Sequence, residues 1–192
     1  MPGLERRYGD DGRAGERGEV MFERGLANTE ISDFYAVAHS VGIPTPPGRK
    51  PMDGDVDFII TNGKNILNID VKNWFVDEAL WTDNDGVFMR GNTHESKRLS
   101  RNMEIAQERW SLALRGAAVS SMVVFVPSNG AAEKIIDVNR LRWPGDIQSY
   151  TAAQSFTEIL RRLGRPRPVD PEITKMIADM QIATPNSIAG AE

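Results

Sequence analysis

The chain has 192 residues, of which 40% are hydrophobic and 26% are charged, the balance of a folded domain rather than of a disordered chain. Its length predicts one domain with, at most, an additional tail. The absence of cysteine excludes disulfide scaffolds, cysteine-zinc sites and cysteine nucleophiles, and two histidines leave little room for a multi-histidine metal site. Because the formal net charge is −4, any nucleic-acid contact must use a local patch or a metal ion that neutralises nearby acids.

Neither a membrane span nor an export signal is visible. No stretch approaches the roughly 18 apolar residues that would cross a bilayer. The N-terminal residues lack the apolar core of a secretory signal. We therefore expect a cytoplasmic protein that makes no membrane contact.

The first fifty residues carry two helical patterns and then a break. Residues 1–14 are rich in Gly, Arg and Asp and predict a flexible lead. A helix is predicted from about 16 to 27, and helical spacing continues from 31 to 38. The inner stripe of the first helix consists of Glu19, Phe22 and Leu26. Four prolines between 43 and 51 exclude a helix or a central strand there and predict a loop.

The following segment predicts a β-hairpin. Strand-like runs at 55–61 and 66–72 flank Asn62-Gly63, the strongest short hairpin signal. A weaker hairpin is predicted at 79–90, with its turn between Trp81 and Val87. The later elements, in order, are a helix at 97–115, a buried strand at 118–126, a short strand at 135–138, a helix at 150–163 and a last helix at 171–182.

Side chains alternate between the two faces of a strand, so the first hairpin has one apolar and one polar face. The apolar face, which must be buried, consists of Val56, Phe58, Ile60, Leu67, Ile69 and Val71. The charged side chains of the opposite face are Asp55, Asp57, Asp70 and Lys72. Acids dominate this second face, whereas an ordinary solvated face has mixed charges.

The length of the turn decides which acids meet. A two-residue turn at Asn62-Gly63 would place Asp57 opposite Asn68, and a four-residue turn from 62 to 65 would place it opposite Asp70. In both registers Asp57 and Asp70 emerge on one face, within roughly 8 Å of each other. Opposed like charges destabilise a sheet, and a bound cation would relieve that cost.

This arrangement suits a hard divalent ion. Mg²⁺ binds a few carboxylates together with waters and phosphate oxygens. Lys72 lies on the same face as Asp70 and could orient an attacking water or stabilise charge that develops on a phosphate. Glu19 could add a third carboxylate from the first helix, and Asp55 is a further candidate. The alternative is that this polar face is simply solvated.

Asp57, followed after a hairpin by Asp70-Val71-Lys72, is similar to the D…(D/E)-x-K signature of the PD-(D/E)xK nuclease superfamily. Neighbouring motifs extend the likeness, namely Gly15-Glu16-Arg17-Gly18-Glu19, Val56-Asp57-Phe58-Ile59-Ile60, the Asn-Gly turn, Ile69-Asp70-Val71-Lys72-Asn73-Trp74 and Trp81. Together they resemble the nuclease-related domain, NERD, from roughly Gly15 to Val126. Two departures are the absence of Pro before Asp57 and the presence of Asp70 where these sequences more often carry Glu.

The resemblance implies an α/β fold with a mixed (α+β) sheet, a restriction-endonuclease-like αβββαβ core with helices on both faces. It also implies metal-dependent cleavage of phosphodiester bonds in DNA. Asp57 and Asp70, with the Val71 carbonyl, would bind Mg²⁺ or Mn²⁺, Lys72 would position the water, and Glu19 would hold metal or water. The accessory residues that this scheme suggests are Asp55 and Gln107, and the DNA-contact candidates on the helix at 97–115 are Lys97, Arg98 and Arg101.

This scheme divides the chain into a flexible lead (1–14), a nuclease-like domain (15–164) and a C-terminal tail with a short helix (165–192). Enzymes of this fold are often dimers, so a homodimer is one expected assembly besides the complex with DNA. Two alternatives stay open. The chain could be a nuclease-fold protein that binds DNA or a protein partner without cutting, or a small phage or plasmid accessory protein.

Overall fold

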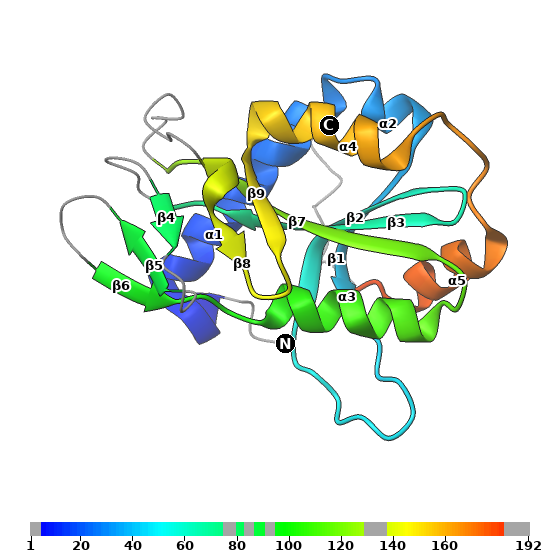
Figure 1. The fold of residues 1–192 in the computed structure, drawn as a ribbon, viewed down its shortest axis with the longest axis horizontal. Helices are drawn as coiled ribbons and strands as arrows, with labels where there is room; N and C mark the ends of the chain where they lie inside the picture. Colours follow the sequence, from blue (N-terminus) through cyan, green and yellow to red (C-terminus); the bar gives the residue numbers. More distant parts are fainter. Residues whose placement is uncertain (1–4, 75–79, 83–86, 91–94, 129–137, 183–192) are drawn as a thin grey trace, which may run out of the picture.

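A six-stranded mixed sheet runs through the centre of the protein. The computed structural model describes residues 5–74, 80–82, 87–90, 95–128 and 138–182. The strands of the sheet lie in the spatial order β1 (Ala36–Gly42), β2 (Asp55–Asn62), β3 (Asn65–Lys72), β7 (Ala118–Phe125), β9 (Ile147–Thr151) and β8 (Arg142–Trp143) (Figure 1). The pairs β3–β7 and β7–β9 are parallel. The pairs β1–β2, β2–β3 and β8–β9 are antiparallel.

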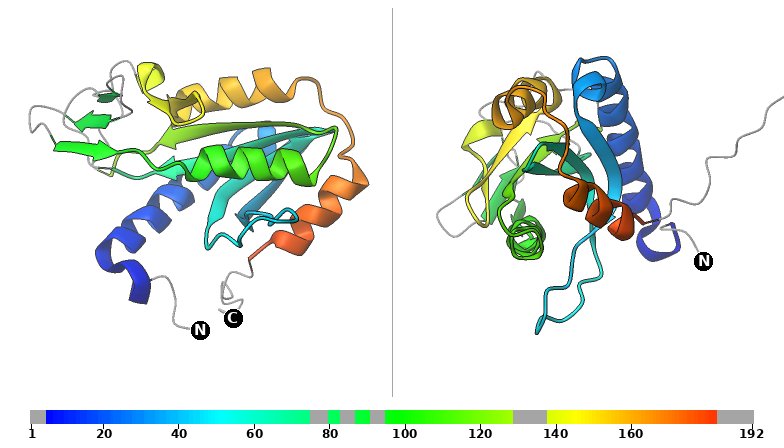
Figure 2. Two further views of the ribbon diagram at one scale, coloured as in Figure 1. Left: turned by 60° about the horizontal axis from the view of Figure 1, so that its bottom comes forward. Right: turned by 90° about the vertical axis from the view of Figure 1, so that its right-hand side faces the viewer.

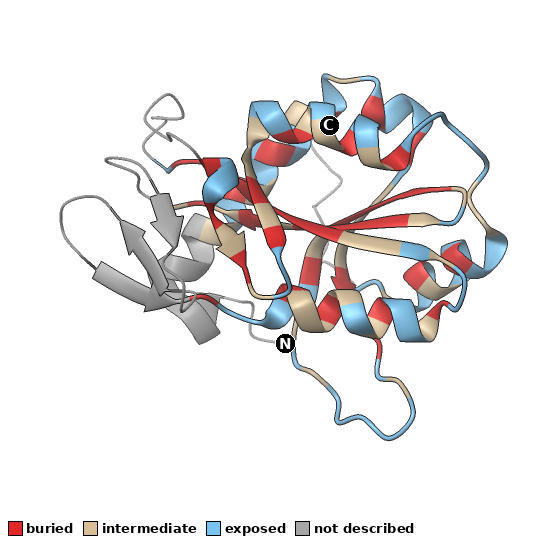
Figure 3. Cartoon of the chain, in the orientation of Figure 1, coloured by how far each residue is buried: buried red, intermediate tan, exposed pale blue. Residues whose placement is uncertain are grey.

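Helices cover both faces of this sheet, as Figure 2 shows. They are α1 (Glu5–Ala27), α2 (Ile31–Phe34), α3 (Asn102–Ala113), α4 (Ala152–Leu163) and α5 (Pro171–Met180). On one face, Phe22 of α1 and Ile159 of α4 belong to the cluster that buries Phe58 and Ile69. On the other, α3 and α5 contribute to the cluster that buries Ile59. Exposed residues lie mainly on the outer sides of these helices and in loops (Figure 3).

The order α1, β1, β2, β3, α3, β7 is the αβββαβ core that the resemblance implies, so the predicted fold class is confirmed. A second, antiparallel sheet follows β3 in the chain and consists of β4 (Leu80–Thr82), β5 (Val87–Arg90) and β6 (Glu95–Arg98). The predicted hairpin at 79–90 is its β4–β5 pair. No helix in the described ranges is long and apolar enough to span a membrane.

The prediction of helix from 31 to 38 is wrong for its second half. Helix α2 ends at Phe34, and Ala36–Gly42 form the edge strand β1, which pairs with β2. Ile31 and Tyr35 have helical spacing and are both buried, but the strand is stabilised by its partner across the sheet, which local spacing does not reveal. The first helix begins at Glu5 rather than near 16.

Three later expectations also change. The helix predicted at 97–115 is strand β6 followed by α3, because residues 95–98 pair with β5. The predicted strand at 135–138 lies outside the described residues except for Val138, which begins the 3₁₀ helix Val138–Arg140 (η3). Helix α4 begins at Ala152 rather than 150, since Tyr150 belongs to β9 and Thr151 forms a capping box with Gln154.

The face of the β2–β3 hairpin opposite Phe58 and Ile69 is covered rather than solvated. Ile59, Ile66 and Asn68 on that face are fully buried, beneath the layer formed by α3 and α5. Val56 also departs from the prediction, because it packs in this second cluster rather than with Phe58. A strand in the middle of a sheet with helices on both faces is buried on both sides, so strict polar-apolar alternation does not apply to it.

Candidate active site

The register of the β2–β3 hairpin places Asp57 and Asp70 just beyond its last residue pair. Asn62 pairs with Asn65 and Phe58 with Ile69, where the paired ladder ends, so Asp57 and Asp70 are the next residue on each strand. This is the second of the two predicted registers. The turn residues are Gly63 and Lys64, with Gly63 at a φ of 59°, a conformation that glycine adopts without steric cost.

A local distortion in the neighbouring strand adjoins Asp57. The β1–β2 ladder pairs His39 with Phe58 and Val41 with Val56, but no pair joins Ser40 and Asp57 between them. Ser40 has a φ of 47°, the left-handed region that few side chains adopt. An irregularity of this kind changes the direction of neighbouring side chains, and it explains why Val56 and Phe58 pack on different faces.

The two aspartates are held by different groups. Asp57 Oδ2 accepts a hydrogen bond of 2.6 Å from the main-chain N–H of Val71. Lys72 Nζ donates to Asp70 Oδ1 at 2.8 Å and lies 2.6 Å from Oδ2. Although Nζ is close to it, Oδ2 is buried and accepts no hydrogen bond with acceptable geometry from any described residue. Both carboxylate oxygens of Asp70 therefore lie within ion-pair distance of the Lys72 ammonium.

Lys72 is confined in a partly apolar setting. Its side chain is 26% exposed, and Nζ lies 5.8 Å from the centre of the Trp143 ring. Burial alone would lower the pKa of Lys72, but the negative charges of Asp70, Asp57 and Glu19 outweigh it and raise that pKa. Lys72 thus stays protonated at neutral pH, which suits a cation that orients water or stabilises phosphate rather than a general base.

Glu19 on α1 belongs to the same electrostatic group. Burial raises the pKa of Glu19, and the charges of Asp55 and Asp70 raise it further. Burial likewise raises the pKa of Asp57 well above its usual range, assisted by Asp70 and Glu19, against the smaller opposing effects of Lys72 and the Val71 N–H. Desolvation of its carboxylate raises the pKa of Asp55, although the residue as a whole is exposed. The negative charge of Asp70 raises that pKa further.

A close contact between helix and sheet fixes the position of Glu19. Gly18 faces the end of β3, where a Cβ atom on this residue would lie only 2.6 Å from Asn73 Cβ. Asn73 is itself held, because its Nδ2 donates to the carbonyl of Val126 at 2.9 Å. One turn further along α1, Phe22 packs edge-on against Phe58, with ring centroids 5.1 Å apart. Gly18 thus allows the approach that brings Glu19 toward the aspartates.

Two of these features were not predicted from sequence. Asn73 appeared only as part of a motif, and its contact with Gly18 joins residues 55 positions apart, which no local pattern reveals. Trp143 comes from β8, and its Nε1 donates to Ser149 Oγ at 2.8 Å, which orients the ring near Lys72. Gly18 itself could have been noticed in the sequence. A glycine inside a helix is costly and therefore signals a close approach of another segment.

The predicted DNA-contact residues do not share one helix. Lys97 and Arg98 lie on β6, and their side chains fall outside the described part of the structure. Arg101 precedes α3 and is paired with Glu104 at 2.6 Å. Gln107 lies on α3, on the opposite face of the sheet from α1, so its place in the site stays a prediction.

The donor set fits a hard cation that retains most of its water. Among the described residues, no group of three or more histidine and acid side chains is arranged to enclose an ion. Mg²⁺ is usually held by one or two carboxylates plus waters and substrate oxygens, so a fully enclosing group is not needed. Asp57 and Asp70 supply two such carboxylates, and the unbalanced negative charge around them favours a cation.

A mixed sheet with helices on both faces, carrying acids and a lysine at the end of paired strands, defines a protein with a nuclease-like α+β fold. The model of the nuclease-related domain (NERD) family matches residues 14–126, more than half of the chain. The protein therefore belongs to the nuclease-related domain family. No match was found among curated proteins or among solved structures.

Proposed function

We propose that this protein is a metal-dependent deoxyribonuclease of the PD-(D/E)xK type. The observation that supports it best is the grouping of Asp57, Asp70 and Lys72 on two paired strands, where Lys72 is bound to Asp70 and Asp57 accepts a hydrogen bond from the Val71 N–H. Family membership supports a nuclease-related role, and the acid–lysine geometry suits hydrolysis of a phosphodiester.

Each residue has a role that follows from its position. Asp57 and Asp70, with the Val71 carbonyl, would hold Mg²⁺ or Mn²⁺, and the ion, when bound, would polarise the scissile phosphate and acidify a water. The protonated Lys72 would orient that water and balance negative charge on the phosphate as the P–O bond forms. Glu19 would accept a hydrogen bond from the water. Hydrolysis adds water across one P–O bond, which leaves a phosphate monoester and a hydroxyl.

The test is cleavage of plasmid and single-stranded DNA with Mg²⁺, with Mn²⁺ and with a chelator. Lys72→Met and Asp70→Asn should lower the rate by at least about 100-fold, since each removes a charge that acts on the reacting phosphate. The control Lys50→Met removes an equivalent charge from an exposed loop residue and should leave the rate unchanged. Thermal unfolding verifies that all three variants fold.

Calorimetric titration with Mn²⁺ complements the cleavage assay. Binding to the wild-type protein that is lost in Asp70→Asn would support the assignment of this ligand. Cleavage at the wild-type rate in both Lys72→Met and Asp70→Asn would refute the proposed mechanism. Absence of Mn²⁺ binding and of cleavage, with and without DNA, would favour instead a family member that binds DNA without cutting it.

A further inference from the structure

The end of the sheet opposite the aspartates carries a group of basic side chains. We name it the basic end, and it consists of Lys64, Arg115, Arg161, Arg162, Arg165 and Arg167. These residues come from the β2–β3 turn, the turn between α3 and β7, the last part of α4 and the segment that leads to α5, which meet at the right-hand side of Figure 1. We propose that the basic end binds the phosphate backbone of nucleic acid, an inference that rests on the proposed nuclease function.

Main-chain hydrogen bonds bring these segments together. The N–H of Ala118, three residues after Arg115, donates to the carbonyl of Lys64 at 2.9 Å. The N–H of Asp170 donates to the carbonyl of Gly63, also at 2.9 Å. Arg167 packs beside that turn, with its Cβ 3.6 Å from the position of a Cβ built on Gly63. The cationic residues are therefore neighbours in space although they are far apart in sequence.

A buried amide makes this surface rigid. Asn62 is 2% exposed, and its Nδ2 donates to the carbonyls of Leu163 at 2.7 Å and Arg165 at 2.8 Å. Its Oδ1 accepts from the N–H of Arg167 at 2.6 Å. The main chain that carries two of the arginines is thus fixed to the β2–β3 hairpin, which reduces the ordering cost of binding a ligand.

Most of the positive charge at this end is not neutralised by the protein. Arg115, Arg165 and Arg167 are exposed, and no ion pair or side-chain hydrogen bond joins any of them to another described residue. Glu158 pairs with Arg161 and Arg162, and Asp170 lies 3.6 Å from Lys64. Even with Glu172, which begins α5 nearby, three carboxylates face six cations, whereas the whole chain has a net charge of −4.

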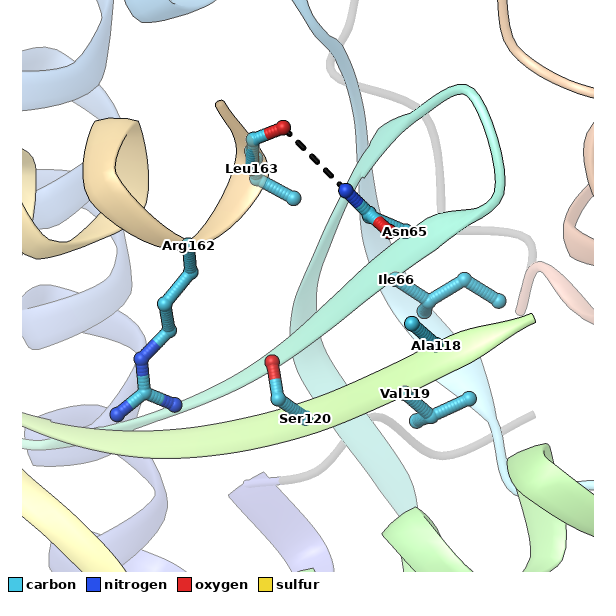
Figure 4. A pocket seen from close by; sticks show the side chains of 7 residues that line it. All are labelled: Asn65, Ile66, Ala118, Val119, Ser120, Arg162 and Leu163. Atoms are coloured by element: carbon cyan, nitrogen blue, oxygen red, sulfur yellow. Dashed lines mark hydrogen bonds between the residues drawn. The ribbon is translucent and has the colours of Figure 1, made fainter. Parts of the chain in front are cut away.

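A cavity of about 300 Å³ adjoins the basic end, and Arg162 is the basic residue that lines it (Figure 4). Arg162 reaches from α4 toward β7, where the Ser120 side chain lines the same cavity. Arg162 is held in place by Glu158 and by the carbonyl of Ser121, to which its Nη1 donates at 2.9 Å. The cavity thus provides a concave surface beside the Arg162 guanidinium.

The chemistry favours nucleic acid over an acidic protein. Five of the six cations are arginines, whose planar guanidinium groups bind phosphate oxygens in pairs. The group of Glu19, Asp55, Asp57 and Asp70 has four carboxylates beside one lysine, so its own side chains attract a polyanion less than the basic end does. Asn65 and Asp70 are five residues apart on β3, about 16 Å. A duplex that spans both ends therefore needs more than about five base pairs.

The test measures binding of fluorescent single-stranded and duplex oligonucleotides in chelator, so that no cleavage occurs. The variant Arg115→Gln/Arg165→Gln removes two exposed charges of the basic end. Arg49→Gln/Lys50→Gln is the control, which removes two exposed charges from the loop between β1 and β2, one of them (Arg49) paired with Glu108 at 2.8 Å. Lys64→Gln/Arg167→Gln is a second test pair in case the first fails to fold.

For a duplex of about 24 base pairs, we expect the first variant to raise the Kd about tenfold at 50 mM salt and to reduce the slope of log Kd against log salt by about two. The control should change neither quantity by more than twofold. For duplexes of about four base pairs, the wild type, Arg115→Gln/Arg165→Gln and the control should cleave at equal rates, because such a substrate does not reach the basic end.

The outcomes separate this inference from the proposed function. If Arg115→Gln/Arg165→Gln leaves the Kd and the salt slope unchanged while the wild type cleaves DNA, the basic end is not a nucleic-acid surface. The proposed nuclease function would be unaffected by that result. Charge-dependent DNA binding without any metal-dependent cleavage would support the basic end and refute the nuclease. Binding of polyglutamate but of no oligonucleotide, lost in the variant, would overturn nucleic acid in favour of an acidic protein partner.

Discussion

The contact between α1 and β3 leads to a prediction about two glycines of the same helix. Gly15 and Gly18 both lie inside α1, where Gly is less favourable than Ala by about 1 kcal/mol. A Cβ on Gly15 would meet no atom within 4 Å, so Gly15→Ala should stabilise the protein by up to about 1 kcal/mol. A Cβ on Gly18 would lie 2.6 Å from Asn73 Cβ.

Since carbon atoms pack at about 3.5 Å or more, helix and strand would have to separate by about 1 Å in Gly18→Ala. Overpacking of this kind costs about 1–3 kcal/mol, which cancels or exceeds the gain in helix propensity. Gly18→Ala should therefore be less stable than Gly15→Ala by about 1–3 kcal/mol. Because Glu19 moves with the helix, cleavage should also fall by up to about 100-fold.

Urea unfolding of the two variants and the wild type measures the free energies, and the plasmid assay measures the rates. The wild type lies between the two variants in the expected order of stability. If Gly18→Ala proved as stable as Gly15→Ala, the tight approach of α1 to Asn73 would be wrong. If it were destabilised while cleavage stayed at the wild-type rate, the helix would be packed as described but Glu19 would have no part in the reaction.

Two further predictions concern the far end of the sheet. Asn62→Ala removes three hydrogen bonds to main-chain groups of α4 and the segment after it, so it should lower the unfolding free energy by about 3 kcal/mol. Asn65→Ala, which removes a single 3.3 Å bond, should cost about 1 kcal/mol or less, and equal losses would contradict the special role of Asn62. For Glu158, hydrogen bonds from Arg161 and Arg162 lower the pKa to about 2, against the opposing effect of burial. A lowered folded-state pKa stabilises the fold above the unfolded pKa near 4.5 and loses that effect as pH falls toward 2. The loss should be about 1 kcal/mol, since Arg161 is 69% exposed, and a urea titration across this pH range should show it in the wild type but not in Glu158→Gln.

The parts of the fold that were predicted correctly are those whose signal is local. The β2–β3 hairpin has its turn signal and two strand-like runs in adjacent segments, and α3 lies within the helix predicted at 97–115. The edge strand β1 has no such signal, because Ala36–Gly42 contains small residues and takes its strand conformation from pairing with β2. Short strands β8 and β9 were missed for the same reason.

The candidate site divides along the same line. Asp57, Asp70 and Lys72 were predicted because they lie on adjacent strands. Side chains on a strand alternate between the two faces, so the pairing of the strands determines which of these side chains lie close together. The groups that orient them come from distant segments, namely α1 through Gly18 and β8 through Trp143, and only the folded chain brings these together. The alternation argument also required burial of only one face of the hairpin, whereas the neighbouring apolar residues Ile59 and Ile60 are a pattern typical of a strand buried on both sides.

The electrostatic cost of the acidic group is itself an argument for function. Raised pKa values of Glu19, Asp55 and Asp57 mean that the fold favours their protonated forms, so that their ionisation at neutral pH destabilises the native state. A purely structural role would be served better by asparagine or glutamine, which fill similar space without repulsion. Lys72 relieves only part of this repulsion, because this one lysine faces three carboxylates, those of Asp70, Asp57 and Glu19. A divalent cation would relieve the remainder and would at the same time give the site an attraction for phosphate that its own side chains lack.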